Sequence, residues 1–127
     1  VPRCINLGVG CKKGAKYKDM IELFDSMGIS DKAVKSISTI DIKMNEPAIL
    51  ALSEYINVPI YTYSSAELNS LEGEFSSSEF VRRITGTDNV CERAAVMSGG
   101  KLIIKKVSAN GITMAASMSN IKIDFGV

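Results

Sequence analysis

The sequence contains no histidine and only three cysteines among its 127 residues. Without histidine, these residues cannot form a Ser–His–Asp triad, a Cys–His dyad, a histidine-ligated zinc site or an axial haem histidine. Proton transfer near neutral pH must then use a carboxylate, a thiol, a lysine, a tyrosine or water. We therefore expect no metal site of the protein's own.

Cysteine is also too scarce to hold the fold together. Cys4, Cys11 and Cys91 are odd in number and form no CxxC pair, so no disulfide framework is indicated. The alternative to any chemical role is that each is a small buried hydrophobe. Reduced cysteines suit the cytosol, and we expect a cytoplasmic protein.

An excess of one charge and long apolar runs are missing too. The 15 basic and 14 acidic residues leave a net charge of +1, whereas duplex nucleic-acid binders carry a strong basic excess. The longest apolar stretches, such as Ala48–Leu52, fall far below the ~20 residues that cross a bilayer. Glycines and Lys12–Lys13 interrupt the start too early for a signal peptide. We expect a soluble single domain over residues 1–127, with no nucleic-acid or membrane partner.

Strand-like and helix-like segments alternate along the chain. The patterns predict strands at residues 4–9, 37–42 and 58–63, helices at 17–27, 45–56 and 64–71, and a helical turn at 30–31. Further helices are predicted at 76–86 and 89–97, followed by strands at 101–107 and 112–117 and a last strand at 121–125.

This order predicts the fold class. Strands that alternate with helices imply right-handed parallel crossovers, with helices on both faces of the sheet. Asn110–Gly111 is a strong hairpin signal, and the hairpin makes the sheet mixed. We expect an α/β protein: three layers, α/β/α, with a mixed, mostly parallel sheet ending in an antiparallel hairpin.

A basic glycine turn separates the first strand from the first helix. Residues 1–18 include no acid and carry a local charge of +5, from Arg3, Lys12, Lys13, Lys16 and Lys18. Ligands of open α/β sheets bind at such turns, and helix-start N–H groups favour anions. Lysines there oppose the helix dipole at about 0.3–1 kcal/mol each, which indicates an anionic ligand. The alternative is a solvated basic turn. The predicted ligand-binding residues are Gly8, Gly10, Cys11, Lys12, Lys13 and Gly14.

Acidic residues follow the second strand at the same edge of the sheet. Asp41 and Glu46 are the candidate catalytic residues that would orient or deprotonate water, and Lys43 is a candidate ligand-binding residue. A carboxylate with a pKa of about 4 is a poor base at pH 7, so burial would have to raise that pKa. Asp41 is the first choice because it ends a strand. The alternative is that Asp41 pairs with Lys43 or caps the helix.

The helix predicted after Asn89 supplies the last candidates. Cys91 lies in its first turn, where the helix dipole lowers a thiol pKa, but no histidine is present as a base. We therefore consider Cys91 and Glu92 as ligand-binding residues, with helix capping as the alternative for Glu92. Lys105 and Lys106 are expected on the surface of the hairpin.

Taken in order, these segments resemble the C-terminal domain of CbiG and its stand-alone counterpart CobE, of cobalamin (vitamin B12) biosynthesis. The resemblance covers about Gly8 to Ala116. The matching segments are Gly8–Gly14, Thr39–Lys43 with Glu46–Pro47, Ser65–Leu68, Gly86, Val90–Glu92 with Ala94–Ala95, and Gly111–Ala116. The resemblance implies a three-layer α/β/α domain with a mixed sheet.

The resemblance also implies a function at the cobalt-precorrin-5A stage, where full-length CbiG acts as a hydrolase that opens a lactone and releases acetaldehyde. Lys12 and Lys13 would pair with carboxylates of the corrinoid precursor. The cobalt would belong to the macrocycle, with no cofactor of the protein's own. The implied partners are the N-terminal part of CbiG and other cobalamin pathway enzymes. The alternatives are a non-catalytic tetrapyrrole-binding or carrier module and a phosphate or nucleotide binder, although the glycine spacing matches neither nucleotide-binding motif.

Overall fold

A computed structural model describes residues 3–71 and 89–119 of the chain. The strands are β1 (Ile5–Cys11), β2 (Val34–Ile40), β3 (Ile60–Tyr63), β4 (Lys101–Ala109) and β5 (Ile112–Met118). The helices are α1 (Tyr17–Ser26), α2 (Pro47–Ile56), α3 (Ser65–Asn69) and α5 (Val90–Met97), with 3₁₀ turns η1 (Asp31–Ala33) and η2 (Asp41–Lys43). The helix predicted at 76–86 and the strand predicted at 121–125 lie outside the described residues.

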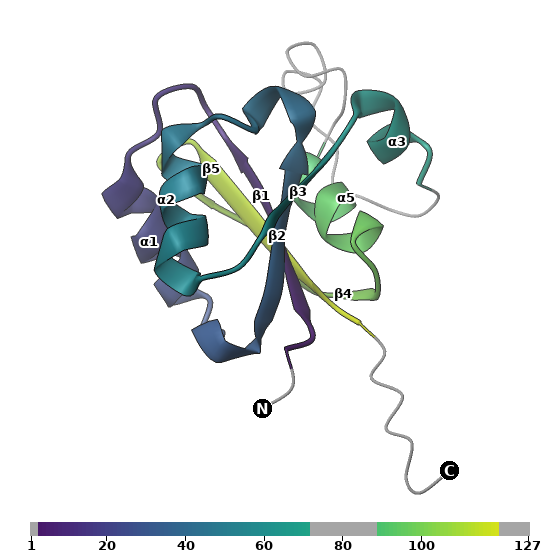
Figure 1. Cartoon of the computed structure of the whole chain (residues 1–127), viewed down its shortest axis with the longest axis horizontal. Helices are drawn as coiled ribbons and strands as arrows, with labels where there is room; N and C mark the ends of the chain where they lie inside the picture. Colours follow the sequence, from purple (N-terminus) through teal and green to yellow (C-terminus); the bar gives the residue numbers. More distant parts are fainter. Residues whose placement is uncertain (1–2, 72–88, 120–127) are drawn as a thin grey trace, which may run out of the picture.

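The strands form one five-stranded sheet in the order β3-β2-β1-β5-β4. β1, β2 and β3 pair in parallel, whereas β5 pairs antiparallel with both β1 and β4. The hairpin predicted at Asn110–Gly111 is therefore present, and β5 lies beside β1 rather than at the edge of the sheet (Figure 1). The expected mixed α/β sheet is confirmed.

Helices cover both faces of this sheet, as the alternating pattern predicts. α1 and α2 lie together on one face, and α5 and α3 lie on the other (Figure 1). α1 buries Met20, Leu23 and Phe24, whose spacing of three and four places them on one side of the helix. The larger core cluster lies beneath α1 and α2, and a smaller one that includes Val90 and Ala94 lies beneath α5.

Several boundaries differ from the sequence-based predictions. β2 ends at Ile40, because the chain turns at Asp41, whose carbonyl accepts the Met44 N–H at 3.1 Å. The sequence predicted that Asp41 ends a strand. This prediction is wrong, because Asp41 is the exposed first residue of η2. β1 continues to Cys11, because Cys11 pairs with Ile112 of β5.

α5 packs directly against the backbone of β1. A Cβ on Gly8 would lie 1.8 Å from the Cys91 carbonyl oxygen and 2.8 Å from the Ala95 backbone nitrogen. Only glycine allows such a close approach of helix and strand. This contact places the N-terminal end of α5 beside the end of β1, where the basic turn begins.

Candidate functional site

A cleft of about 680 Å³ lies at the carboxyl ends of β1 and β2. This is the edge of an open α/β sheet at which ligands bind. Four parts of the chain contribute: the turn after β1, η2, the start of α5 and the β4–β5 hairpin. The lining residues are Gly10, Cys11, Lys12, Lys13, Ile40, Ile42, Lys43, Asn89, Val90, Lys106, Ser108, Ala109, Asn110, Gly111, Ile112 and Thr113.

The charge of the cleft is of one sign. Lys12, Lys13, Lys43 and Lys106 line it, and no aspartate or glutamate is among its described lining residues. Within residues 3–71 and 89–119, none of these lysines forms a salt bridge. Between the lysines the walls are aliphatic, with isoleucine and valine side chains. The cleft therefore suits a ligand with an apolar body and several anionic groups.

Glu46 holds the basic turn in place. Its Oε1 accepts the Gly14 N–H at 3.0 Å, across the gap between the two loops that follow β1 and β2. The Lys12 N–H donates to the Gly111 carbonyl at 2.8 Å, so the same turn is also tied to the hairpin. Glu46 thus acts here as a hydrogen-bond acceptor for the backbone, and it does not line the cleft.

Glu92 orients the hairpin in a similar way. The β4–β5 register shifts between Ile104 and Val107, which marks a bulge, and a bulge leaves a backbone group without a partner strand. The buried Glu92 carboxylate accepts the Lys106 N–H from this bulge at 2.7 Å. Lys106, expected only as a surface residue, lies half-buried on the cleft wall.

The two cysteines near the cleft are protonated at neutral pH. Burial, and to a lesser extent the Glu46 carboxylate, raises the pKa of the Cys11 thiol to about 11 against the opposing charge of Lys43. Burial raises the pKa of Cys91 to about 12, which outweighs the helix dipole. Neither thiol is an activated nucleophile, and Cys91 is fully buried beneath the cleft.

The predicted site residues fall into two groups. The structure brings Gly10, Cys11, Lys12, Lys13 and Lys43 together on the cleft lining. The others are not among the lining residues: Gly8, Gly14, Asp41, Glu46, Cys91 and Glu92.

Sequence reasoning missed the lining residues that come from the hairpin and from Asn89. The hairpin was predicted from Asn110–Gly111, but its pairing with β1 was not. That pairing sets Thr113 opposite Gly10 and Ile112 opposite Cys11. It is therefore the step that brings the hairpin to the ligand-binding edge.

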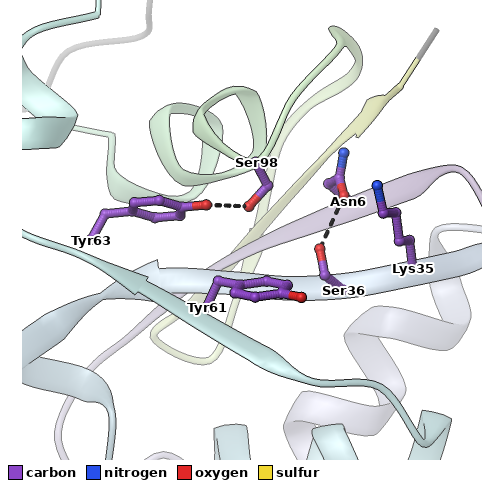
Figure 2. A pocket seen from close by; sticks show the side chains of 6 residues that line it. All are labelled: Asn6, Lys35, Ser36, Tyr61, Tyr63 and Ser98. Carbon is purple, nitrogen blue, oxygen red and sulfur yellow. Dashed lines mark hydrogen bonds between the residues drawn. The ribbon is translucent and has the colours of Figure 1, made fainter.

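A smaller pocket of about 220 Å³ lies near the starts of β1 and β2, by the end of α5 (Figure 2). Four of its polar side chains form hydrogen-bonded pairs. Ser36 donates to Asn6 Oδ1 at 3.0 Å, and the Tyr63 and Ser98 hydroxyls lie 2.9 Å apart. Asn6 Nδ2 also donates to the Gly99 carbonyl at 2.8 Å. These bonds anchor the C-terminal end of α5 to the sheet, which is a structural role.

Within residues 3–71 and 89–119, no three cysteine, aspartate or glutamate side chains are grouped so that they could hold a metal ion. No helix in the same residues is long and apolar enough to cross a membrane.

Known proteins match this chain over nearly its whole length. The family described as "Cobalamin synthesis G C-terminus" matches residues 5–117. Cobalt-precorrin-5A hydrolase of Salmonella typhimurium is 26% identical over 125 residues, which cover 94% of this chain and 36% of that protein. Protein CobE of Sinorhizobium is 29% identical over 117 residues, covering 86% of this chain and 76% of that protein.

The fold has a counterpart among solved structures. The crystal structure of a CobE protein from the cobalamin biosynthetic pathway superposes with a TM-score of 0.79 at 24% sequence identity. The match covers 94% of this chain and 93% of the other. At this level of identity the likeness establishes the fold.

Proposed function

The chain belongs to the cobalamin synthesis G C-terminus family, and on this premise we propose that it acts in cobalamin biosynthesis by binding a corrinoid precursor. The observation that carries this proposal is the cleft with four lysines and no carboxylate among its described lining residues. A corrinoid precursor has an apolar ring with acetate and propionate groups around it. Its shape and charge thus complement aliphatic walls between lysines.

Two kinds of interaction support binding of such a ligand. Hydrogen bonds to charged groups contribute about 1.5–3 kcal/mol each when they are well formed, and less where water screens them. Burial of the apolar ring against Ile40, Ile42 and Val90 adds roughly 25 cal/mol per Å² removed from water. The lysines would select a polycarboxylate, and the aliphatic walls would orient its ring.

We infer that this chain contributes ligand binding to a larger hydrolase rather than the water-activating group. The chain spans 36% of the Salmonella hydrolase, so most of that enzyme has no counterpart here. The candidate carboxylates of Glu46 and Glu92 accept backbone N–H groups, and Asp41 is exposed at the start of η2. The second candidate function is a non-catalytic tetrapyrrole carrier, favoured by the 76% of CobE that the chain covers.

Further features of the proposal follow from the sequence. We propose that residues 1–127 form a single domain and that the protein acts in the cytoplasm, consistent with the free cysteines at positions 4, 11 and 91. Any cobalt would be held by the macrocycle and would enter with it. The N-terminal part of a CbiG-like protein and other cobalamin pathway enzymes are the proposed partners.

Isothermal titration calorimetry with two corrinoids tests the proposed function. Cobyrinic acid has free peripheral carboxylates, whereas in cobinamide these groups are amidated. We expect cobyrinic acid to bind at least about tenfold more tightly than cobinamide, because the amide groups cannot form charge-assisted hydrogen bonds with the lysines. We also expect the affinity for cobyrinic acid to fall as salt is added, because salt screens the attraction between opposite charges. Equal affinity for the two corrinoids, or tight binding of ATP without either of them, would contradict the proposal.

Asp41→Asn in a full-length hydrolase carrying this domain tests where the chemistry resides. We expect turnover to stay within about threefold of the unmodified enzyme, because the exposed Asp41 carboxylate lacks the burial that a general base requires. Asp31→Asn, which changes another exposed aspartate at the start of a 3₁₀ turn (η1), is the control. If Asp41 is instead the base, as the sequence predicted, turnover falls by about 10²–10⁴ with little change in binding.

A further inference from the structure

Asn89 is a buried residue of the cleft with an unused hydrogen-bond donor. It lines the cleft, and only 4% of its surface is exposed. In the part of the chain that the structure describes, its Nδ2 is the buried side-chain nitrogen or oxygen atom that has no hydrogen-bond partner. Because an unpaired buried amide lowers stability, a native structure that keeps one requires an explanation.

The orientation of this amide is determined by its other end. Asn89 Oδ1 accepts the Glu92 N–H at 3.3 Å and the Cys91 thiol at 3.4 Å. Exchanging the amide oxygen and nitrogen would set an NH₂ group against a backbone N–H, so the oxygen must face the helix. Asn89 also adopts a left-handed backbone conformation (φ 49°), which asparagine tolerates better than most residues. The position of the Asn89 Nδ2 donor is thus fixed by the backbone conformation and by the two hydrogen bonds that Oδ1 accepts.

The surroundings of this donor favour an anion. Asn89 caps the N-terminus of α5, an eight-residue helix whose first N–H groups carry partial positive charge. Lys106 lines the same cleft, and Glu92 ties its backbone to the first turn of α5. Asn89, Val90 at the start of α5 and Lys106 all belong to the lining of this cleft. A carboxylate oxygen accepts hydrogen bonds from backbone N–H, amide and ammonium groups.

We propose that Asn89 is a ligand-binding residue whose side-chain N–H donates to one carboxylate of the corrinoid at the N-terminus of α5. The inference rests on the proposed function and deepens it, since it assigns one ligand group to one end of the cleft. Lys106 pairs with the same carboxylate. The lysines of the turn after β1 then bind carboxylates at the other side of the ring.

Calorimetry with cobyrinic acid on three variants tests this assignment. Asn89→Gly tolerates the left-handed backbone but removes the donor, and Asn89→Asp keeps the helix cap while replacing the donor with an acceptor. We expect affinity to fall about tenfold in Asn89→Gly and more in Asn89→Asp. Asn57→Asp is the matched control, because Asn57 also has a positive φ but is exposed and does not line the cleft; we expect at most about a threefold loss there.

The outcomes separate this inference from the function on which it rests. If the unmodified chain binds cobyrinic acid and both Asn89 variants bind it equally well, Asn89 is a structural cap only and the inference is wrong. If the unmodified chain does not bind cobyrinic acid, the proposed function fails as well. Inorganic phosphate competing more tightly than the corrinoid, in an Asn89-dependent manner, would replace the carboxylate with a phosphate.

A second measurement uses the unmodified chain, so its result does not depend on whether a variant folds. In ¹H–¹⁵N spectra of the unmodified chain, we expect the side-chain NH₂ signals of Asn89 to shift downfield when cobyrinic acid is added. Unshifted Asn89 NH₂ signals at saturation would overturn the assignment.

Discussion

Replacing both Lys12 and Lys13 with alanine is expected to lower the affinity for cobyrinic acid by about 10–100-fold at low salt. Both side chains are exposed on the cleft lining, without an acidic partner in the described part of the chain. In the proposed complex these lysines break no ion pair when the ligand binds, and each gains a charge-assisted bond to a ligand carboxylate. Added salt should reduce the affinity of the double variant less steeply, because fewer charges remain to be screened.

Calorimetry at two salt concentrations measures both effects, and thermal unfolding checks the fold. Exposed lysines contribute little to stability, so the melting temperature should barely change. Lys16→Ala with Lys18→Ala is the control, since it removes the same charge from the start of α1 without changing the cleft lining. An equal loss of affinity in that control, or an unchanged affinity in the Lys12 and Lys13 variant, would contradict the proposed role.

Gly8→Ala is expected to destabilise the protein by about 3 kcal/mol or more, a large share of the 5–15 kcal/mol typical of a domain. The new methyl group would lie 1.8 Å from the Cys91 carbonyl oxygen, which belongs to the backbone of α5. A backbone atom cannot rotate aside, so α5 must move away from β1. That movement opens the smaller core cluster and displaces the start of α5 from the cleft.

Urea denaturation measures this change, with Gly10→Ala as the control. There the added methyl group would lie 2.8 Å from Thr113 Oγ1, the end of a side chain that can rotate at the expense of its 3.4 Å bond to the Gly10 carbonyl. We expect Gly10→Ala to cost about 1 kcal/mol. A Gly8→Ala protein within about 1 kcal/mol of the unmodified chain would show that α5 does not pack this closely.

Features that depend on a few consecutive residues could be predicted from the sequence. The Ser64–Glu67 capping box is present with both of its hydrogen bonds, and α2 has Pro47 in its first turn, as predicted, although it starts two residues after the predicted position 45. The Asn110–Gly111 turn joins two strands with both residues at positive φ. Such signals are local, because a cap, a proline or a tight turn acts on the backbone within one turn of its own position.

Features that join distant parts of the chain depend on how the elements pack. Glu46 accepts the N–H of Gly14, 32 positions away, and Glu92 accepts the backbone N–H of Lys106, 14 positions away. The sequence predicted a catalytic role for Glu46 and a ligand-binding role for Glu92, whereas in the structure both carboxylates are acceptors for backbone N–H groups. Lys106 lies on the cleft wall next to a bulge in β4, and no residue pattern in the sequence predicted that bulge. The raised thiol pKa of Cys91 follows from burial under β1, against the local effect of its helix. In each case the partners are brought together by the pairing of strands that are distant in the sequence or by the packing of α5 on the sheet. Pairing of that kind is not encoded in short-range spacing.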